Sequence, residues 1–400
     1  MTTHAGLADA LDPDVAADAL ADADLLDREV ETDLRATLRG LLRERLDPAA
    51  QIRALDGDAP HDRSLWAALA GDLGLAGLLV PEDLGGAGAT ACEAGVVLEE
   101  LAAAAAAVPF LSSAVVATSA LVAAPPGDPR DEALRRLAAG DTTAALAVPL
   151  ITAPGAAWPT STTWTGAVLE GSVTSVADGE QAGYAVVPAR SGEVPVLVLA
   201  DAGRAASPRL SFDQTRRLAD LRVEATPGAV LASGGDAVAA LDAALRTGAG
   251  LLASEQLGLA RWCLDETVAY VKVRRQFGRP VGSFQALKHR LADIWLEVTS
   301  LRAAARYAAD RLARPGAPDA ETVLAVTVAA AFAAGVAVHA AEEALQLHGG
   351  IGMTWEHPLH LRLKRAKADQ LAFGTAGRHR ARLATLVDLP GPSEEAVRAR

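Results

Sequence analysis

The chain has 400 residues, half of them apolar, and a formal net charge of −13 at pH 7. This length is enough for more than one domain, and the composition lacks the signature of disorder. The acidic balance argues against a nucleic-acid partner, which would need a basic surface. Cys92 and Cys263 lie far apart, without a CxxC spacing or a nearby histidine pair. We therefore expect buried thiols in a reducing cytoplasm and no metal site.

Neither the first residues nor the apolar runs indicate targeting or membrane insertion. Residues 1–12 are polar and acidic, so we expect no signal peptide. The longest apolar run, Leu101–Phe110, is mostly alanine and too short to span a bilayer. We therefore predict a cytoplasmic protein without a membrane partner.

The first part of the chain is predicted to be helical. Residues 1–24 are predicted to form an acidic N-terminal arm, and residues 25–140 an N-terminal α-helical domain. Within it, Gly74–Val80 is an apolar, strand-like segment followed by a turn rich in proline and glycine. The predicted helices cover residues 27–45, 65–73, 90–107, 112–123 and 131–139.

A middle β domain is predicted over residues 141–235. Short runs of Val, Leu and Thr are broken there by Gly, Pro and Asp, which is typical of a small barrel or sandwich. The candidate strands are residues 144–150, 164–169, 185–187, 194–199 and 221–225.

The helical pattern returns after residue 235 and predicts a C-terminal four-helix bundle over residues 236–390, followed by a tail at 391–400. The fold class is therefore mostly α with a β middle domain. The four bundle helices are predicted at about 236–273, 284–313, 317–347 and 359–387.

The most informative segment, Arg274–Gln285, lies between the first two bundle helices. Its Gly278 and Pro280 end one helix and let the next begin, so three cations, an amide and a phenyl ring share a helix–helix corner. Guanidinium groups suit phosphate and a ring suits stacking, so the corner fits an anion that carries a flat ring. The alternative is a solvated, arginine-rich turn.

Two further motifs follow. Gln346–Gly352 ends the third bundle helix and contains three glycines in four residues, which lets a ligand approach the backbone closely. No predicted strand precedes it, so it is not a strand–turn–helix dinucleotide fingerprint, and a glycine-rich helix cap is the alternative. Pro358–Arg365 then leads into Phe373-Gly374-Thr375.

Together these motifs resemble the acyl-CoA dehydrogenase family over residues 60–390. The resemblance implies an α domain, a β domain and a four-helix bundle that bind FAD and an acyl-CoA as a tetramer and pass electrons to an electron-transfer flavoprotein. The matching segments are Gly77–Gly88 for GLLVPExxGGxG, Arg274–Gln285 for RxQFGxPxxxFQ, Gln346–Gly352 for QxxGGxG, Pro358–Arg365 for PxxxRxxR, and Gly374-Thr375 for the terminal Gly-Thr pair.

The resemblance also implies residue roles. The RxQFG and QxxGGxG segments would reach the FAD of a neighbouring subunit, whereas the terminal threonine would touch the FAD of its own subunit. The implied reaction is α,β-desaturation, in which a carboxylate removes the α-proton and the flavin accepts the β-hydride. The implied FAD-binding residues are Arg274, Gln276, Phe277, Gln346, Gly349, Gly350 and Thr375.

The catalytic base of the family is missing from both of its usual positions. The usual glutamate before Gly-Thr is Phe373, and the alternative position in the first bundle helix falls at or near Gly248. The base is therefore unknown. Glu255, two turns along the same helix face, is a candidate, with a capping or interhelical ion pair as the alternative. Glu266 fits a solvated helix face.

The β domain departs from the family as well. The family's FAD loop, roughly TEPxAGSD, corresponds to Val148–Ala157, which lacks the Glu, Ser and Asp. Trp158 and Trp164 could pack on a flavin or fill the β core. Asp213–Arg216 could be an interface turn, a substrate-side turn or a plain loop.

These losses form a pattern. Elements that serve a neighbour's FAD are kept, whereas elements that serve the chain's own FAD and catalysis are lost. The chain therefore resembles the degenerate subunit of actinobacterial heterotetrameric acyl-CoA dehydrogenases, in which each unlike pair shares one FAD and one active site. The alternatives are a self-sufficient homotetramer that uses Glu255 or another acid, and a scaffold or regulatory paralogue without flavin. A flavin monooxygenase or nitroalkane oxidase on the same fold would need features that we do not find, and the acyl group and partner chain stay unidentified.

Overall fold

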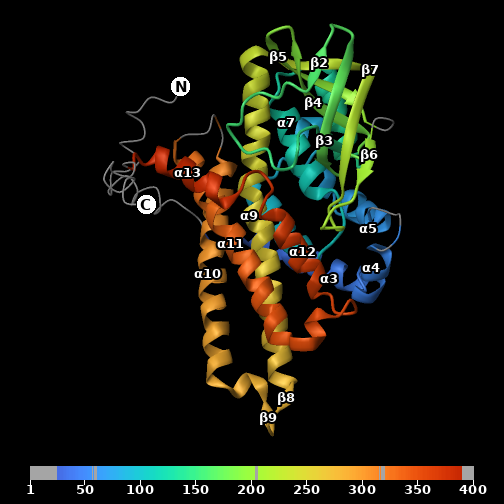
Figure 1. Ribbon diagram of the computed structural model, residues 1–400. Helices are drawn as coiled ribbons and strands as arrows, with labels where there is room; N and C mark the ends of the chain where they lie inside the picture. The colour runs from blue at the N-terminus through green and yellow to red at the C-terminus, as the bar shows by residue number, and fades with distance from the viewer. Residues whose placement is uncertain are drawn as a thin grey trace.

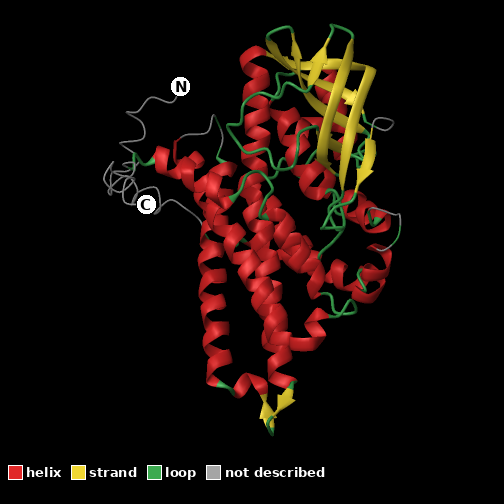
Figure 2. Cartoon of the chain, in the orientation of Figure 1, coloured by secondary structure: helices red, strands yellow, loops and turns green. Residues whose placement is uncertain are grey.

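The computed structural model describes residues 25–55, 57, 61–202, 206–314, 316 and 320–389 (Figure 1). The predicted acidic arm and C-terminal tail lie outside the described residues. Helices form most of the described chain, and a compact β domain lies against one end of the long helices (Figure 2). This confirms the predicted fold class.

The described residues before residue 141 form helices and turns. The strand predicted over Gly74–Val80 is wrong, because the segment folds into 3-10 turns whose backbone bonds are local, such as Val80 N–H to Gly77 O at 3.0 Å. The elements are α3 (Glu29–Arg45), α4 (Pro48–Leu55), α5 (Arg63–Ala67), η1 (Ala68–Asp72), η2 (Leu75–Gly77), η3 (Glu82–Leu84), α6 (Ala91–Ala103), η4 (Phe110–Ala117), α7 (Thr118–Ala123) and α8 (Asp128–Ala138).

The β domain is a small barrel. Its sheet has the order β1-β4-β2-β3-β7-β5, and the added β4–β5 pairing closes the ring, while β6 pairs with β7. The strand predicted over Trp164–Leu169 instead spans the turn between β2 and β3, where Gly166 has a φ of 95°. The strands are β1 (Ala144–Leu146), β2 (Thr162–Trp164), β3 (Val168–Ala177), β4 (Tyr184–Ser191), β5 (Val194–Asp201), β6 (Ala206–Arg209) and β7 (Leu218–Ser233).

The C-terminal region contains three long helices and a fourth that is broken. The helix predicted over 359–387 is interrupted because Phe373 and Gly374 have φ values of 51° and 104°, which a right-handed helix excludes. The Phe373 N–H instead donates to the Leu150 carbonyl of the β domain at 2.8 Å. The elements are α9 (Gly234–Val273), β8 (Arg275–Gln276), β9 (Arg279–Pro280), η5 (Val281–Ser283), α10 (Gln285–Ala313), α11 (Ala320–His348), η6 (Gly349–Met353), α12 (Leu359–Asp369) and α13 (Ala376–Leu386).

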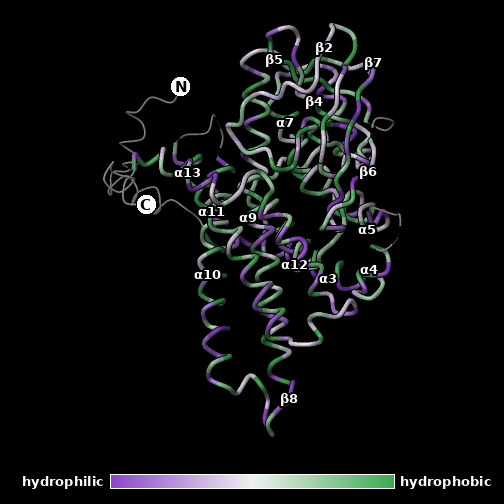
Figure 3. The backbone as a smooth tube through the Cα atoms, in the orientation of Figure 1, coloured by the Kyte–Doolittle hydropathy of each residue, from purple (hydrophilic) through white to green (hydrophobic). Residues whose placement is uncertain are grey.

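One large apolar core joins the N-terminal helices to the bundle, and a second fills the barrel. Hydrophobic and hydrophilic residues alternate along the bundle helices (Figure 3). Contrary to the sequence expectation, Gly234–Val273 and Ala320–Met353 are long and apolar enough to cross a membrane. Their most apolar windows are 67% and 61% buried within the protein, as in core helices, so this is weak evidence for a membrane.

Candidate functional site

The predicted corner at Arg274–Gln285 is a β-hairpin that projects from the far end of the bundle (Figure 1). Its turn residues, Phe277 and Gly278, have φ values of 52° and 76°, as a tight two-residue hairpin turn requires. Phe277 is 88% exposed. Arg274 and Arg275 are exposed and have no ion pair with any residue that the structure describes. The hairpin therefore offers unpaired cations and an uncovered ring.

The second motif lies at the same end of the molecule. The ring of His348, the last residue of α11, stacks on Tyr270 of α9 with ring centroids 4.5 Å apart. Tyr270 precedes the hairpin by one helical turn. Gln346, Gly349 and Gly350 are exposed, and a Cβ built on either glycine would meet no atom within 4 Å. The hairpin and the glycine turn thus lie near each other, and together they present cations, side-chain amides and open backbone.

Thr375 lies elsewhere. It caps α13, its hydroxyl accepting from the Arg378 N–H at 3.3 Å, and it follows the link that bonds to the β domain through Leu150. Figure 1 shows the β domain at the end of α9 opposite the hairpin. The predicted cofactor residues therefore form two groups. One lies in and beside the hairpin, and the other, Thr375, lies toward the opposite end of α9.

The two positions of the missing base face each other. A Cβ built on Gly248 of α9 would lie 2.9 Å from the Phe373 ring, which is 4% exposed. The two positions that the resemblance assigns to the base therefore lie together, and neither carries an acid. Beside the ring the remaining cavity is only about 20 Å³ and is lined by Leu111, Val116 and Leu146 among others. The Phe373 ring therefore occupies the space beside Gly248.

Glu255 is an interhelical ion-pair residue. Its carboxylate is 1% exposed and accepts from Arg216 Nη2 at 2.5 and 2.6 Å and from Arg365 Nε at 2.6 Å. Burial alone would raise the pKa of Glu255, but the two guanidinium groups outweigh burial and lower it to about 2. A base for an α-proton needs a raised pKa, so this carboxylate is unsuited to that role.

The same network ties the β domain to the bundle. Arg216 also donates to Asp369 of α12 at 2.6 Å, and burial together with the Glu255 charge raises the pKa of Asp369. Asp213, Thr215 and Arg216 are all buried, so the Asp213–Arg216 segment is no solvated loop. Sequence reasoning missed the pairing of this segment with the PxxxRxxR helix. The available sequence signal for this pairing was a cluster of charged residues between apolar stretches.

The loop that replaces the family's FAD loop is held by the chain's own bundle. The Gly155 N–H donates to Asp242 of α9 at 2.7 Å, and Arg382 Nη1 donates to the Pro154 carbonyl at 2.8 Å. Trp158 donates to the Ala189 carbonyl at 3.0 Å, and Trp164 is buried in the barrel core. These contacts favour structural roles for both tryptophans.

A cavity of about 580 Å³ lies between the barrel and α12. Its wall is mostly apolar, with a few hydroxyl and charged groups, as in many sites for flat organic ligands. The cavity adjoins the hydrogen bond between Leu150 and the α12–α13 link, so it lies on the same side of the molecule as Thr375. Its lining includes Leu150, Ile151, Thr174, Ser175, Phe212 and Leu371.

Comparisons with known proteins agree with this architecture. The family models for the N-terminal and C-terminal domains of acyl-CoA dehydrogenases match residues 28–141 and 237–387. The acyl-CoA dehydrogenase IpdE2 of Mycolicibacterium smegmatis is 35% identical over 85% of this chain and 93% of its own length. IpdE2 of Mycobacterium tuberculosis is 36% identical over 83% of this chain and 89% of its own length.

Two solved structures are similar in sequence and fold. The ChsE4-ChsE5 complex from Mycobacterium tuberculosis has a TM-score of 0.81 and 28% identity, covering 92% of this chain and all of the matched one. A variant of the Tcur3481-Tcur3483 steroid ACAD has a TM-score of 0.79 and 28% identity, covering 90% of this chain and 98% of the matched one. The chain therefore belongs to the acyl-CoA dehydrogenase family.

Proposed function

We propose that this chain is one subunit of an FAD-dependent acyl-CoA dehydrogenase and shares FAD and active site with an unlike partner chain that supplies the base. The observation that carries the proposal is the contact between Phe373 and Gly248. A phenyl ring and a glycine cannot accept a proton, and the ring leaves only about 20 Å³ beside it.

The hairpin and the glycine turn fit the FAD of another chain. Exposed Arg274 and Gln276 would bind anionic and polar groups, and Gly349 and Gly350 would allow close backbone approach. When bound, FAD supplies the hydride acceptor. The position of these residues at the bundle end far from Thr375 supports a role toward a neighbour.

The substrate that we propose is an acyl-CoA thioester, which the shared site would desaturate between its α and β carbons. The carboxylate that removes the α-proton would come from the partner, since Glu255 is held ionised by Arg216 and Arg365. An electron-transfer flavoprotein would accept the electrons. We further propose a cytoplasmic location.

The test is to purify the chain alone and together with an acyl-CoA dehydrogenase encoded beside it, and to record flavin spectra and activity. The proposal predicts no flavin and no activity for the single chain, and both for the mixed complex. A flavin-containing, active homotetramer would contradict it in favour of a self-sufficient enzyme. A mixed complex without flavin would contradict it in favour of a scaffold.

A further inference from the structure

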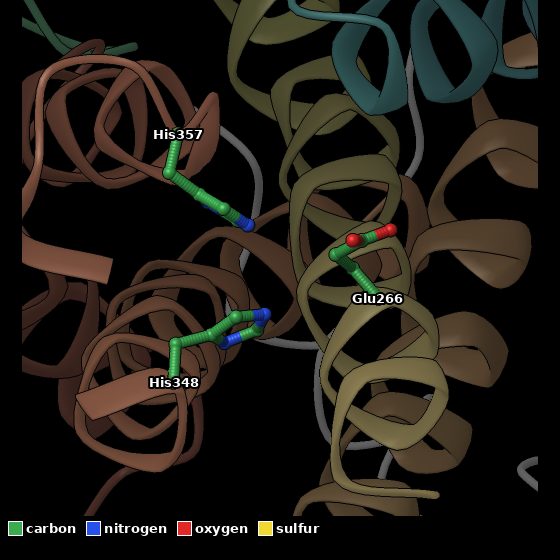
Figure 4. Close-up of side chains that lie close together, drawn as sticks. All are labelled: Glu266, His348 and His357. Atoms are coloured by element: carbon green, nitrogen blue, oxygen red, sulfur yellow. The ribbon is translucent and has the colours of Figure 1, made fainter. Parts of the chain in front are cut away.

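Three potential metal ligands converge where α9, the end of α11 and the segment before α12 meet. Glu266 lies on α9, His348 ends α11, and His357 precedes α12 (Figure 4). One ligand atom of each side chain lies within 4.8 Å of the others. Glu266 is distant in the sequence from the two histidines, so the spacing gave no indication of a shared site. The close-up shows a nitrogen of each histidine directed toward the space beside the Glu266 carboxylate.

His348 has the orientation of a metal-binding histidine. Its Nδ1–H donates to the Ala344 carbonyl oxygen at 2.8 Å, which leaves the lone pair on Nε2. The residue is 2% exposed, and Nε2 has no hydrogen-bond partner among the described residues. A buried nitrogen acceptor without a partner destabilises the fold. A cation at this point would satisfy it.

From this geometry we infer that Glu266, His348 and His357 form a binding site for one Zn²⁺ ion. Two imidazoles and one carboxylate are a common zinc donor set, with a fourth position left for water. The inference does not rest on the proposed function. The ion would hold α9, the end of α11 and the segment before α12 together beside the Gly349 turn.

The site needs only small side-chain movements to close. Zinc–ligand distances of about 2.0–2.1 Å place tetrahedral ligand atoms about 3.4 Å apart. His348 is fixed by Ala344 and by Tyr270, whereas Glu266 and His357 are half-buried. Binding through His357 Nε2 would move its proton to Nδ1 and replace the long 3.3 Å bond from the Leu359 N–H.

The positive charge of Arg362 acts on His357 and opposes a dication. The Arg362 guanidinium, however, is directed to the Ala103 and Pro358 carbonyl oxygens and lies 4.0 Å over the Trp262 ring. The Glu266 carboxylate offsets part of its charge. Two imidazoles and one carboxylate therefore face the ion.

The experiment uses the full chain without an affinity tag, treated with a chelator and titrated with Co²⁺, whose visible spectrum reports coordination, and then with competing Zn²⁺. We expect one ion per chain, displacement of Co²⁺ by Zn²⁺ and a Zn²⁺-dependent rise in melting temperature. Glu266→Gln and His357→Ala should each weaken binding at least about tenfold, since even outer contacts of metal ligands are worth that much. Both positions are half-buried, so these variants keep the test valid if His348→Ala fails to fold.

The matched control is His339→Ala, because His339 and Glu297 form an exposed histidine–carboxylate pair, 2.7 Å apart. It should leave the Co²⁺ titration unchanged. The assignment is wrong if the wild-type chain gives no saturable Co²⁺ spectrum. It is equally wrong if Glu266→Gln and His357→Ala bind like wild type, or if His339→Ala abolishes binding, since the ion would then be adventitious.

Discussion

Replacing Glu255 by glutamine separates a structural role from a catalytic one. Glutamine keeps the size of the side chain but removes the charge that Arg216 and Arg365 share. A pKa lowered from 4.5 to about 2 corresponds to about 3 kcal/mol of stability near neutral pH. Loss of one partner from a buried ion pair costs a similar amount, about 3–5 kcal/mol.

Part of this loss will be recovered. The Glu255 charge contributes to the raised pKa of Asp369, so Asp369 can ionise and pair more strongly with Arg216 once that charge is gone. We therefore expect Glu255→Gln to lower the free energy of unfolding by about 2–3 kcal/mol. The assay is urea denaturation followed by circular dichroism and tryptophan fluorescence.

The pH dependence has a defined sign. Because the folded-state pKa of Glu255 is lowered, its stabilisation is present above about 4.5 and is lost as the pH falls toward about 2. The difference between wild type and variant should shrink over that window. The exposed pair of Glu342 and Lys367 provides the control, and Glu342→Gln should cost less than about 1 kcal/mol. An unfolding free energy for Glu255→Gln within about 0.5 kcal/mol of wild type would refute the reasoning and reopen a catalytic role.

Three further predictions concern other parts of the chain. Gly248→Ala should destabilise the protein by about 1–3 kcal/mol, because the added Cβ would lie 2.9 Å from the Phe373 ring and 3.0 Å from Val116 Cγ2. In a Phe373→Ala background the same change should cost less, because only the Val116 contact then stays tight, and a double-mutant cycle from urea midpoints measures this coupling. Arg274→Ala should leave the melting temperature unchanged, since the side chain is exposed, but should lower the FAD retained by the mixed complex; equal retention would contradict its cofactor role. Burial lowers the pKa of His61, but the Asp178 charge outweighs it and raises the pKa above 6.5, so this pair stabilises the fold at lower pH and loses that contribution as pH rises through the folded-state pKa. His61→Gln should remove this pH dependence from urea midpoints, and an unchanged profile would contradict it.

The element order and the family were predictable from sequence because long helical periodicity and ordered motifs carry that information locally. The break at Phe373 was not predictable. It depends on a left-handed backbone at a bulky residue, held by a hydrogen bond to Leu150 in another domain. The turns in Gly74–Val80 were also missed, since an apolar run of that length fits a strand or a buried turn equally well.

The candidate site was predictable only in part. Sequence motifs identified the Arg274 hairpin, but its exposure and hairpin geometry come from the structure. The sequence left the role of Glu255 open, because the partners that settle it, Arg216 and Arg365, are brought to it from distant segments. The convergence of Glu266 with two histidines was likewise invisible, since helical packing alone joins them.

The central claim is that this chain completes its site only with an unlike partner. Native mass spectrometry of the complex purified with its neighbouring acyl-CoA dehydrogenase tests this most directly, because it counts chains and cofactors together. We predict equal numbers of the two chains with one FAD for each unlike pair. One FAD for every copy of this chain, in an assembly that contains no other protein, would contradict the account.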